Sequence, residues 1–144
     1  MACDAASLSI RGERMGGGTG TVQADLYVEN VGRSVCGLSG SPHGIAIVRT
    51  DGIVLPIAVR QVDPVELGPP VTLEPGVADA ANVAFNWSNW CGATLGPLRV
   101  QLTLPDGSKV TGPLAMVGYS VPRCDDPTAS SAIEQLWGFA SPSP

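Results

Sequence analysis

Thr21 to Glu29 reads TVQADLYVE, and this alternation of apolar and polar residues is the clearest structural pattern in the chain. Successive side chains of an extended strand point to opposite faces of a sheet. The period of two therefore predicts a strand with one polar face and one buried face, formed by Val22, Ala24, Leu26 and Val28. A half-buried strand of this kind is typical of an antiparallel sheet.

Similar short runs recur along the chain, and Gly, Pro, Asn and Asp residues that favour turns separate them. Asp51-Gly52 and Asp106-Gly107 each lie between two such runs, where glycine can adopt the positive φ of a tight hairpin turn. The spacing of the runs predicts an all-β fold, a β-sandwich. Besides Thr21–Glu29, the predicted strands are Ser7–Ile10, Gly44–Arg49, Ile53–Val59, Val71–Leu73, Ala78–Trp87, Leu98–Leu104 and Lys109–Met116.

Helical periodicity is nearly absent from the chain. Only Thr128 to Leu136 carries a pattern that predicts one or two helical turns. Met15 to Gly20, MGGGTG, predicts a flexible loop tip, and residues 140–144, ASPSP, predict a disordered C-terminal tail. Because 144 residues leave room for one core, we expect a single domain over residues 1–139.

The charge balance limits the classes of partner. Thirteen Asp and Glu residues outnumber eight Lys and Arg residues, which gives a net charge of −5. So few cations cannot neutralise a phosphate backbone, and we expect no binding to nucleic acid or to an anionic membrane. No stretch approaches the roughly 18 apolar residues of a membrane-spanning helix. We therefore expect no membrane insertion by this chain, while a lipid or transmembrane anchor upstream of it stays open.

The four cysteines are Cys3, Cys36, Cys91 and Cys124. No Cys-x-x-Cys pair is present and the chain has one histidine, so a zinc site would need all four thiolates. Disulfides are the simpler interpretation. Four cysteines allow three connectivities, and we expect Cys3–Cys36 and Cys91–Cys124 because each pair closes a separate half of the chain.

Two disulfides imply export to an oxidising compartment, either extracellular or associated with the cell envelope. Met1 and Ala2 lead directly into Cys3, so we expect that a signal peptide has been trimmed from this sequence. Lipidation of Cys3 would leave one unpaired thiol in an exported protein, and we do not favour it.

Two longer stretches carry a resemblance to a known family. Tyr27 to Gly40 reads YVENVGRSVCGLSG, and Val71 to Cys91 reads VTLEPGVADAANVAFNWSNWC. Together with an early cysteine, an Asp-Gly hairpin and a late Cys124, this order resembles the exported actinobacterial "domain of unknown function four-two-three-two" family. The resemblance implies a secreted or lipid-anchored domain with an immunoglobulin-like antiparallel β-sandwich of about seven to nine strands, and it implies no activity. Where the family usually has an aromatic-Pro step this chain has Ser41-Pro42-His43, and Gln61–Pro70 is Pro-rich in its own way.

Two polar motifs invite a catalytic or metal-binding interpretation. His43 lies near Ser39 and Ser41, but the segment does not match the G-x-S-x-G pattern, so we expect a solvent or structural role for His43. Asp125-Asp126 could offer carboxylates to calcium, but this cation needs about six oxygens, and we interpret the pair as an acidic turn that caps a short helix. We expect no catalytic residue, no metal site and no cofactor.

Trp87-Ser88-Asn89-Trp90 is the strongest candidate for a binding surface. Exposed indole rings beside Asn and Ser would form a platform for a sugar face or for an apolar patch of a partner. The alternative is that Phe85 and Trp87, which share a strand face, fill the core, while Trp90 stays open between the two interpretations. The candidate binding surface consists of Trp87, Asn89, Trp90, His43 and Ser41.

These features together favour an exported, non-enzymatic binding module at the cell envelope, with a protein or a cell-wall polysaccharide as its partner. One alternative is a small secreted protease inhibitor that presents the Pro-stiffened loop Gln61–Pro70, QVDPVELGPP, to a protease cleft. The other alternative is a purely structural ectodomain module of an anchored protein.

Overall fold

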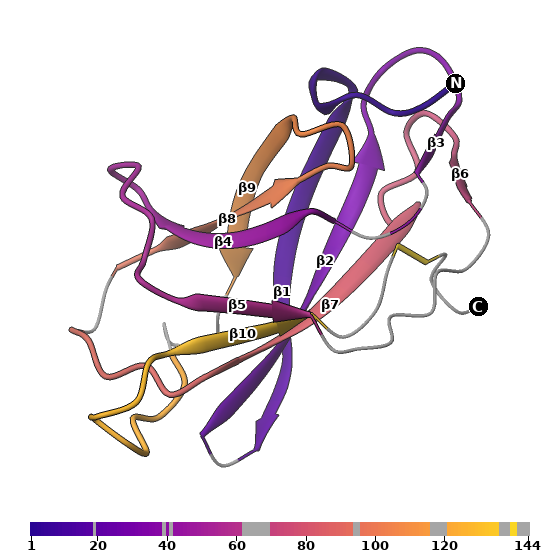
Figure 1. The fold of residues 1–144 in the computed structure, drawn as a ribbon. Helices are drawn as coiled ribbons and strands as arrows, with labels where there is room; N and C mark the ends of the chain where they lie inside the picture. Colours follow the sequence, from indigo (N-terminus) through magenta and orange to yellow (C-terminus); the bar gives the residue numbers. More distant parts are fainter. Residues whose placement is uncertain are drawn as a thin grey trace.

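The computed structural model describes residues 1–18, 20–38, 40, 42–61, 70–93, 96–115, 121–135 and 139–140 (Figure 1). These residues form ten strands and one short 3-10 turn, with no α-helix among them. The elements are η1 Ala5–Ser7, β1 Leu8–Gly18, β2 Thr21–Asn30, β3 Cys36–Leu38, β4 Gly44–Arg49, β5 Ala58–Gln61, β6 Val71–Leu73, β7 Ala81–Ser88, β8 Leu98–Thr103, β9 Lys109–Ala115 and β10 Ala132–Gln135.

Eight strands form one sheet in the order β4-β8-β9-β1-β2-β7-β10-β5, and β3 and β6 form a separate two-stranded sheet. β1 is the central link, because it pairs antiparallel with β2 and, at Gly12–Leu114 and Glu13–Ala115, parallel with β9. β10 also pairs parallel with β5. The expected all-β fold is confirmed, but the described residues form ten strands where seven to nine were expected, and the large sheet is mixed and not antiparallel.

The large sheet curls until it is nearly a barrel (Figure 1). Its two end strands, β4 and β5, follow each other in the chain, and the segment between them stays attached to β4 through the bridge between Val48 and Val54. The strands on the two sides of β1 therefore pack across a common core. Gly12 lies at this crossing, where a Cβ would be 2.6 Å from Leu114 and 2.9 Å from Leu26.

β2 has the two faces that its sequence predicts. Val22, Ala24, Leu26 and Val28 are 4%, 2%, 0% and 0% exposed and pack into the core. Burial of each large apolar side chain contributes about 2 kcal/mol relative to an exposed position. Because β2 lies between β1 and β7, this row of side chains joins the central strands of the sheet to the core.

Both Asp-Gly hairpin turns are confirmed. Gly52 and Gly107 have a φ of 90°, which glycine adopts without strain. The Gly52 N–H donates to Arg49 O and the Gly107 N–H donates to Leu104 O, each at 2.9 Å, and these bonds close the turns. The second turn joins β8 to β9.

Most of the loop tip predicted at Met15 to Gly20 is strand. β1 continues to Gly18, and its last pairs are Gly17 with Val22 and Gly18 with Thr21. The pairing of β1 with β2 shifts by one residue between Arg14 and Gly16, which marks a β-bulge, and the strand continues beyond it. Backbone pairing with β2 outweighs the low strand propensity of these glycines.

The predicted helix at residues 128–136 is wrong, because residues 132–135 form β10 between β7 and β5. Ile133 is fully buried in this slot and pairs with Trp87 on one side and Val59 on the other. Insertion satisfies the backbone hydrogen bonds on both sides of the segment and buries its apolar side chain, and these gains outweigh local helix propensity.

Both predicted disulfides are present. The Cα–Cα distances are 4.9 Å for Cys3–Cys36 and 4.7 Å for Cys91–Cys124, and each bond spans 33 residues. Two disulfides are typical of a protein that folds in an oxidising compartment outside the cytoplasm. Within the ranges that the structure describes, no helix has the length and hydropathy needed to cross a membrane.

Candidate functional site

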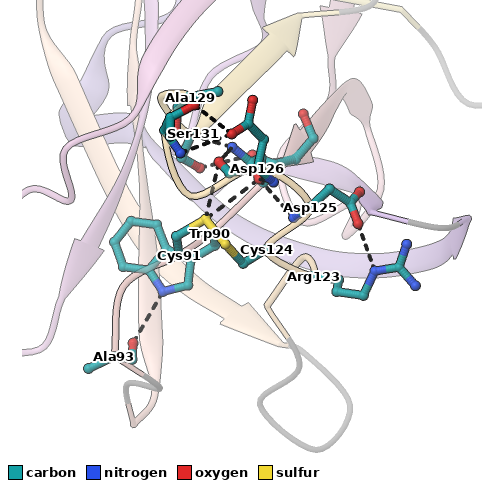
Figure 2. The surroundings of a disulfide bond; sticks show 12 residues. Trp90, Cys91, Ala93, Arg123, Cys124, Asp125, Asp126, Ala129 and Ser131 are labelled. Carbon is teal, nitrogen blue, oxygen red and sulfur yellow. Dashed lines mark hydrogen bonds and ion pairs between the residues drawn. A yellow bond between two sulfur atoms is a disulfide. The ribbon is translucent and has the colours of Figure 1, made fainter.

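The tryptophan motif, residues 87–90, leads into the Cys91–Cys124 disulfide (Figure 2). We call the region around this bond, residues 89–91 and 123–131, the disulfide corner. Asn89 has a φ of 59° and is the only non-glycine residue with a positive φ in the described part of the chain. Asparagine tolerates this left-handed conformation better than most residues. The chain therefore turns sharply between the end of β7 and Cys91.

The Asn89 side chain fastens the loop that follows Cys124. Its Nδ2 donates to Asp126 O at 2.9 Å and to Ala129 O at 3.2 Å. Its Oδ1 accepts the backbone N–H groups of Asp125 and Asp126, both at 2.9 Å. An amide has two donor hydrogens and two acceptor lone pairs, so these four bonds use its whole capacity. Asn89 is therefore a structural clamp, and its place in a binding surface stays a prediction.

Neither tryptophan forms the exposed platform that was one interpretation of the motif. Trp87 is 1% exposed and Trp90 is 8% exposed, and their ring centroids lie 5.9 Å apart. The Trp87 Nε1–H donates to Ser131 Oγ at 2.9 Å. The Trp90 Nε1–H donates to Ala93 O at 3.1 Å (Figure 2). The turn at Asn89 breaks the strand alternation, so both indoles pack into the core with their polar atoms satisfied.

The acidic pair of the corner shapes a turn. Asp125 forms an ion pair with Arg123 at 2.7 Å (Figure 2). Asp126 Oδ1 accepts the hydroxyl and the backbone N–H of Thr128, and these two hydrogen bonds lower the pKa of the Asp126 carboxyl. No group of three or more potential metal ligands occurs among the residues that can be described. The acidic turn is as predicted, but it leads into β10 and not into a helix.

His43 is exposed, and its backbone N–H donates to Thr103 O at 2.9 Å. Its neighbours Ser39 and Ser41 lie outside the described residues. Residues 62–69 of the Pro-rich loop Gln61–Pro70 also lie outside them. The solvent or structural role of His43, the place of His43 and Ser41 in a binding surface, and the inhibitor loop therefore stay predictions.

The motif residues that carry the family resemblance meet at one buried junction. Asn30 is 0% exposed. Its Nδ2 donates to Ser34 O at 2.8 Å and to Leu73 O at 3.0 Å. Its Oδ1 accepts the Gly32 N–H at 2.9 Å. The Gly76 N–H donates to Asn30 O at 3.0 Å. The junction holds the end of β2 against the β3–β6 sheet, so these motif positions serve the fold.

A charged cluster on the outer face of β1 and β2 was not anticipated from the sequence. Arg11 forms ion pairs with Glu13, at 3.3 Å, and with Asp79, and its guanidinium lies 4.8 Å from the centre of the Tyr27 ring. The Tyr27 hydroxyl donates to Asp25 at 3.5 Å, and burial raises the pKa of the Asp25 carboxyl. The alternation in the sequence placed Asp25 on a polar face, but Arg11 and Glu13 lie beyond the predicted strand Ser7–Ile10, and only the pairing of β1 with β2 brings these side chains together.

The outer face of β4, β8 and β9 has a different character. On β8, Leu98, Val100 and Leu102 are buried, so the residues between them point outward. The registers of β8 with β4 and β9 extend this outward face across three strands. We call it the cationic face; its residues are Gly44, Ala46, Val48, Arg99, Gln101, Thr103, Lys109, Thr111 and Pro113.

Arg99 and Lys109 are the only charged residues of the cationic face. Both are exposed, and neither has an ion-pair partner in the described part of the chain. The Gln101 Nε2–H donates to Thr111 Oγ1 at 3.4 Å between them. The other residues of this face carry no charge, so the face is positively charged although the net charge of the chain is −5.

Comparison with known families assigns the chain to a group. A family model described as "Domain of unknown function (DUF4232)" matches residues 3–132. The chain belongs to this family. The matched part of this DUF4232 domain contains all four cysteines and the Asn30 junction, and it ends at the first residue of β10. Neither the search of curated proteins nor the search of solved structures gave a match.

Proposed function

We propose that this DUF4232 domain is an exported, non-enzymatic binding module of the cell envelope, whose cationic face binds an acidic cell-wall polysaccharide. The observation that carries the proposal is the placement of Arg99 and Lys109, two exposed and unpaired cations on a face of three strands without a carboxylate. In a chain of net charge −5, a face that carries two cations and no carboxylate is a favourable place for an anion.

The chemistry of the face fits a hydroxyl-rich chain with widely spaced negative charges. Arg99 pairs with Pro113, and Thr103 pairs with Lys109, so the two cations are four residues apart along the strands, or about 14 Å. Between them, Gln101, Thr103 and Thr111 offer amide and hydroxyl groups that can bond to sugar hydroxyls. Two cations suffice for a sparsely charged glycan, whereas a nucleic acid would need many more.

A protein partner is less well matched to this face. Energetically dominant contacts in protein interfaces are enriched in Trp and Tyr that fill pockets, and the cationic face has no aromatic residue. Its one larger apolar side chain, Val48, is 6% exposed and has little surface left to contribute.

The fold and the compartment belong to the same proposal. We infer an immunoglobulin-like arrangement, in which β4-β8-β9 faces β2-β7 across the core and β1 belongs to both halves. The strand order of the large sheet and the parallel pairing of β1 with β9 support this arrangement. The two disulfides support export. The family resemblance adds secretion or lipid anchoring in an actinobacterium.

Co-sedimentation of the disulfide-intact domain with purified cell-wall and polysaccharide fractions tests the proposal. We expect binding that weakens as salt is added, and a loss of about tenfold in affinity for Arg99→Ala and for Lys109→Ala. Arg60→Ala is the matched control, because Arg60 is exposed on β5, outside the cationic face, and its removal changes the net charge equally.

Two outcomes would contradict the proposal. If Arg60→Ala weakens binding as much as Arg99→Ala does, the interaction depends on net charge and not on the cationic face. If no fraction binds the domain, the polysaccharide is the wrong class of ligand.

A further inference from the structure

The two disulfides have equal loop lengths but opposite solvent access. Each spans 33 residues, so the loop-closure entropy contributes equally to both bonds. Cys3 and Cys36 are 6% and 7% exposed and belong to the core, whereas Cys91 and Cys124 are both exposed. An attacking thiolate must reach a sulfur atom of the bond, so access distinguishes the reactivities of the two bonds.

We propose that Cys91–Cys124 is a site of reversible thiol–disulfide exchange with a dithiol reductant, while Cys3–Cys36 is a permanent structural bond. This inference does not depend on the proposed polysaccharide binding. The co-reactant is a dithiol, either a small molecule or the active-site pair of an oxidoreductase.

The exchange proceeds in two displacements. One thiolate of the dithiol attacks the Sγ of Cys91 or Cys124, forms a mixed disulfide with it and releases the other cysteine as a thiolate, which takes up a proton. The second thiol of the reductant then attacks the mixed disulfide and releases the remaining cysteine. Two electrons and two protons pass to the protein, and the reductant becomes a disulfide.

The disulfide corner is built to keep its shape when the bond opens. The four hydrogen bonds of Asn89 to the loop after Cys124 do not involve a sulfur atom. The Arg123–Asp125 ion pair (Figure 2) also involves no sulfur atom. The same holds for the hydrogen bond from Trp87 to Ser131. The two thiols therefore stay close together after reduction, and their reoxidation is an intramolecular reaction at high effective concentration.

The buried bond lies where the N-terminal segment pairs with β3. The Cys3 N–H donates to Gly37 O at 3.0 Å and the Gly37 N–H donates to Met1 O at 2.9 Å, and both cysteines of the bond are buried. A reductant reaches this bond only after the segment leaves β3. Reduction of Cys3–Cys36 is therefore coupled to local unfolding.

Timed reduction of the native chain with dithiothreitol, followed by acid quenching, alkylation and peptide mapping, tests the proposal. Cleavage after Arg and Lys places each cysteine in a different peptide, because Arg11, Arg33, Arg60, Arg99 and Arg123 separate them. We expect Cys91 and Cys124 to be alkylated at least about tenfold faster than Cys3 and Cys36. We also expect unchanged circular dichroism at that stage, and recovery of the bond after the reductant is removed.

Asn89→Gly supplies the control for reversibility, because glycine keeps the left-handed backbone and loses the clamp. In this variant we expect recovery of the Cys91–Cys124 bond to slow by about tenfold as the effective concentration falls. Equal rates for the two bonds, earlier release of Cys3 and Cys36, or loss of the native spectrum on opening of Cys91–Cys124 would each overturn the proposal.

Discussion

Replacement of Asn89 measures how strongly one side chain holds the disulfide corner. Asn89→Gly removes four hydrogen bonds, at 2.9, 3.2, 2.9 and 2.9 Å, and leaves the backbone free to keep its φ of 59°. The site is partly exposed, so water replaces the lost partners and each bond contributes about 0.5 kcal/mol, the low end of the usual range. We therefore expect the free energy of unfolding to fall by about 2 kcal/mol.

Asn89→Ala separates the side-chain bonds from the backbone conformation. Alanine loses the same four bonds and also places a Cβ in the left-handed region, which costs about 1 kcal/mol more. The expected loss for this variant is then about 3 kcal/mol. The difference between the alanine and glycine variants measures the backbone term alone.

Urea unfolding at pH 7 with both disulfides intact provides the assay, with tryptophan emission as the signal. Asn86→Ala is the control, because the outward amide of Asn86 on β7 makes no side-chain hydrogen bond within the described residues, and we expect a change within about 0.5 kcal/mol. An Asn89→Gly variant as stable as the Asn86→Ala control would refute the idea that the amide network holds the corner. Equal stability of the glycine and alanine variants would refute the backbone term.

Three further expectations follow from other contacts. The Thr128 hydroxyl and backbone N–H lower the pKa of Asp126, so this carboxylate stabilises the fold above its unfolded pKa of about 3.9 and ceases to do so as pH falls through the lower folded value. In urea titrations, the stability difference between wild type and Asp126→Ala should therefore shrink between pH 7 and pH 3. A constant difference would contradict this expectation. Ser131→Ala leaves the buried indole N–H of Trp87 without a partner and should cost about 2 kcal/mol by thermal unfolding, whereas the exposed neighbour Ser130→Ala should cost almost nothing. Gly112→Ala would put a Cβ 1.8 Å from Ile10 O and should destabilise the β1–β9 contact by about 3 kcal/mol. Gly96 has open space around its Cβ position and should tolerate alanine. Similar melting temperatures for the two variants would contradict the close approach of β9 to Ile10 O.

Several strand positions were predictable, whereas the predicted strand Ile53–Val59 overlaps β5 only at its last two residues. Gly44–Arg49 and Val71–Leu73 match β4 and β6 at both ends, and Thr21–Glu29 differs from β2 by one residue. In each case the alternation of apolar and polar side chains lies within the segment itself, so no knowledge of neighbours was needed. The disulfide pairing was also predictable from the sequence, since each bond closes its own half of the chain.

The tryptophan motif shows where sequence reasoning stopped. An indole at the end of a strand can face water or the core, and both choices are compatible with the residues around it. The left-handed turn at Asn89 sent Trp90 inward, and the clamp that supports this turn needs carbonyl and N–H groups from residues 125–129. A contact across more than thirty residues leaves no periodic pattern in the sequence.

The sequence by itself determined an all-β domain, its main strands, its Asp-Gly turns and its two disulfides, because these depend on side-chain alternation, on glycine conformation and on the position of each cysteine. The tertiary structure alone decided that residues 132–135 form a strand, that both indoles are buried, and that Arg99 and Lys109 share one carboxylate-free face. Each of these depends on which strands become neighbours. Strand order is set by packing between distant segments, and the free energy of that packing outweighs the local preferences that a sequence displays.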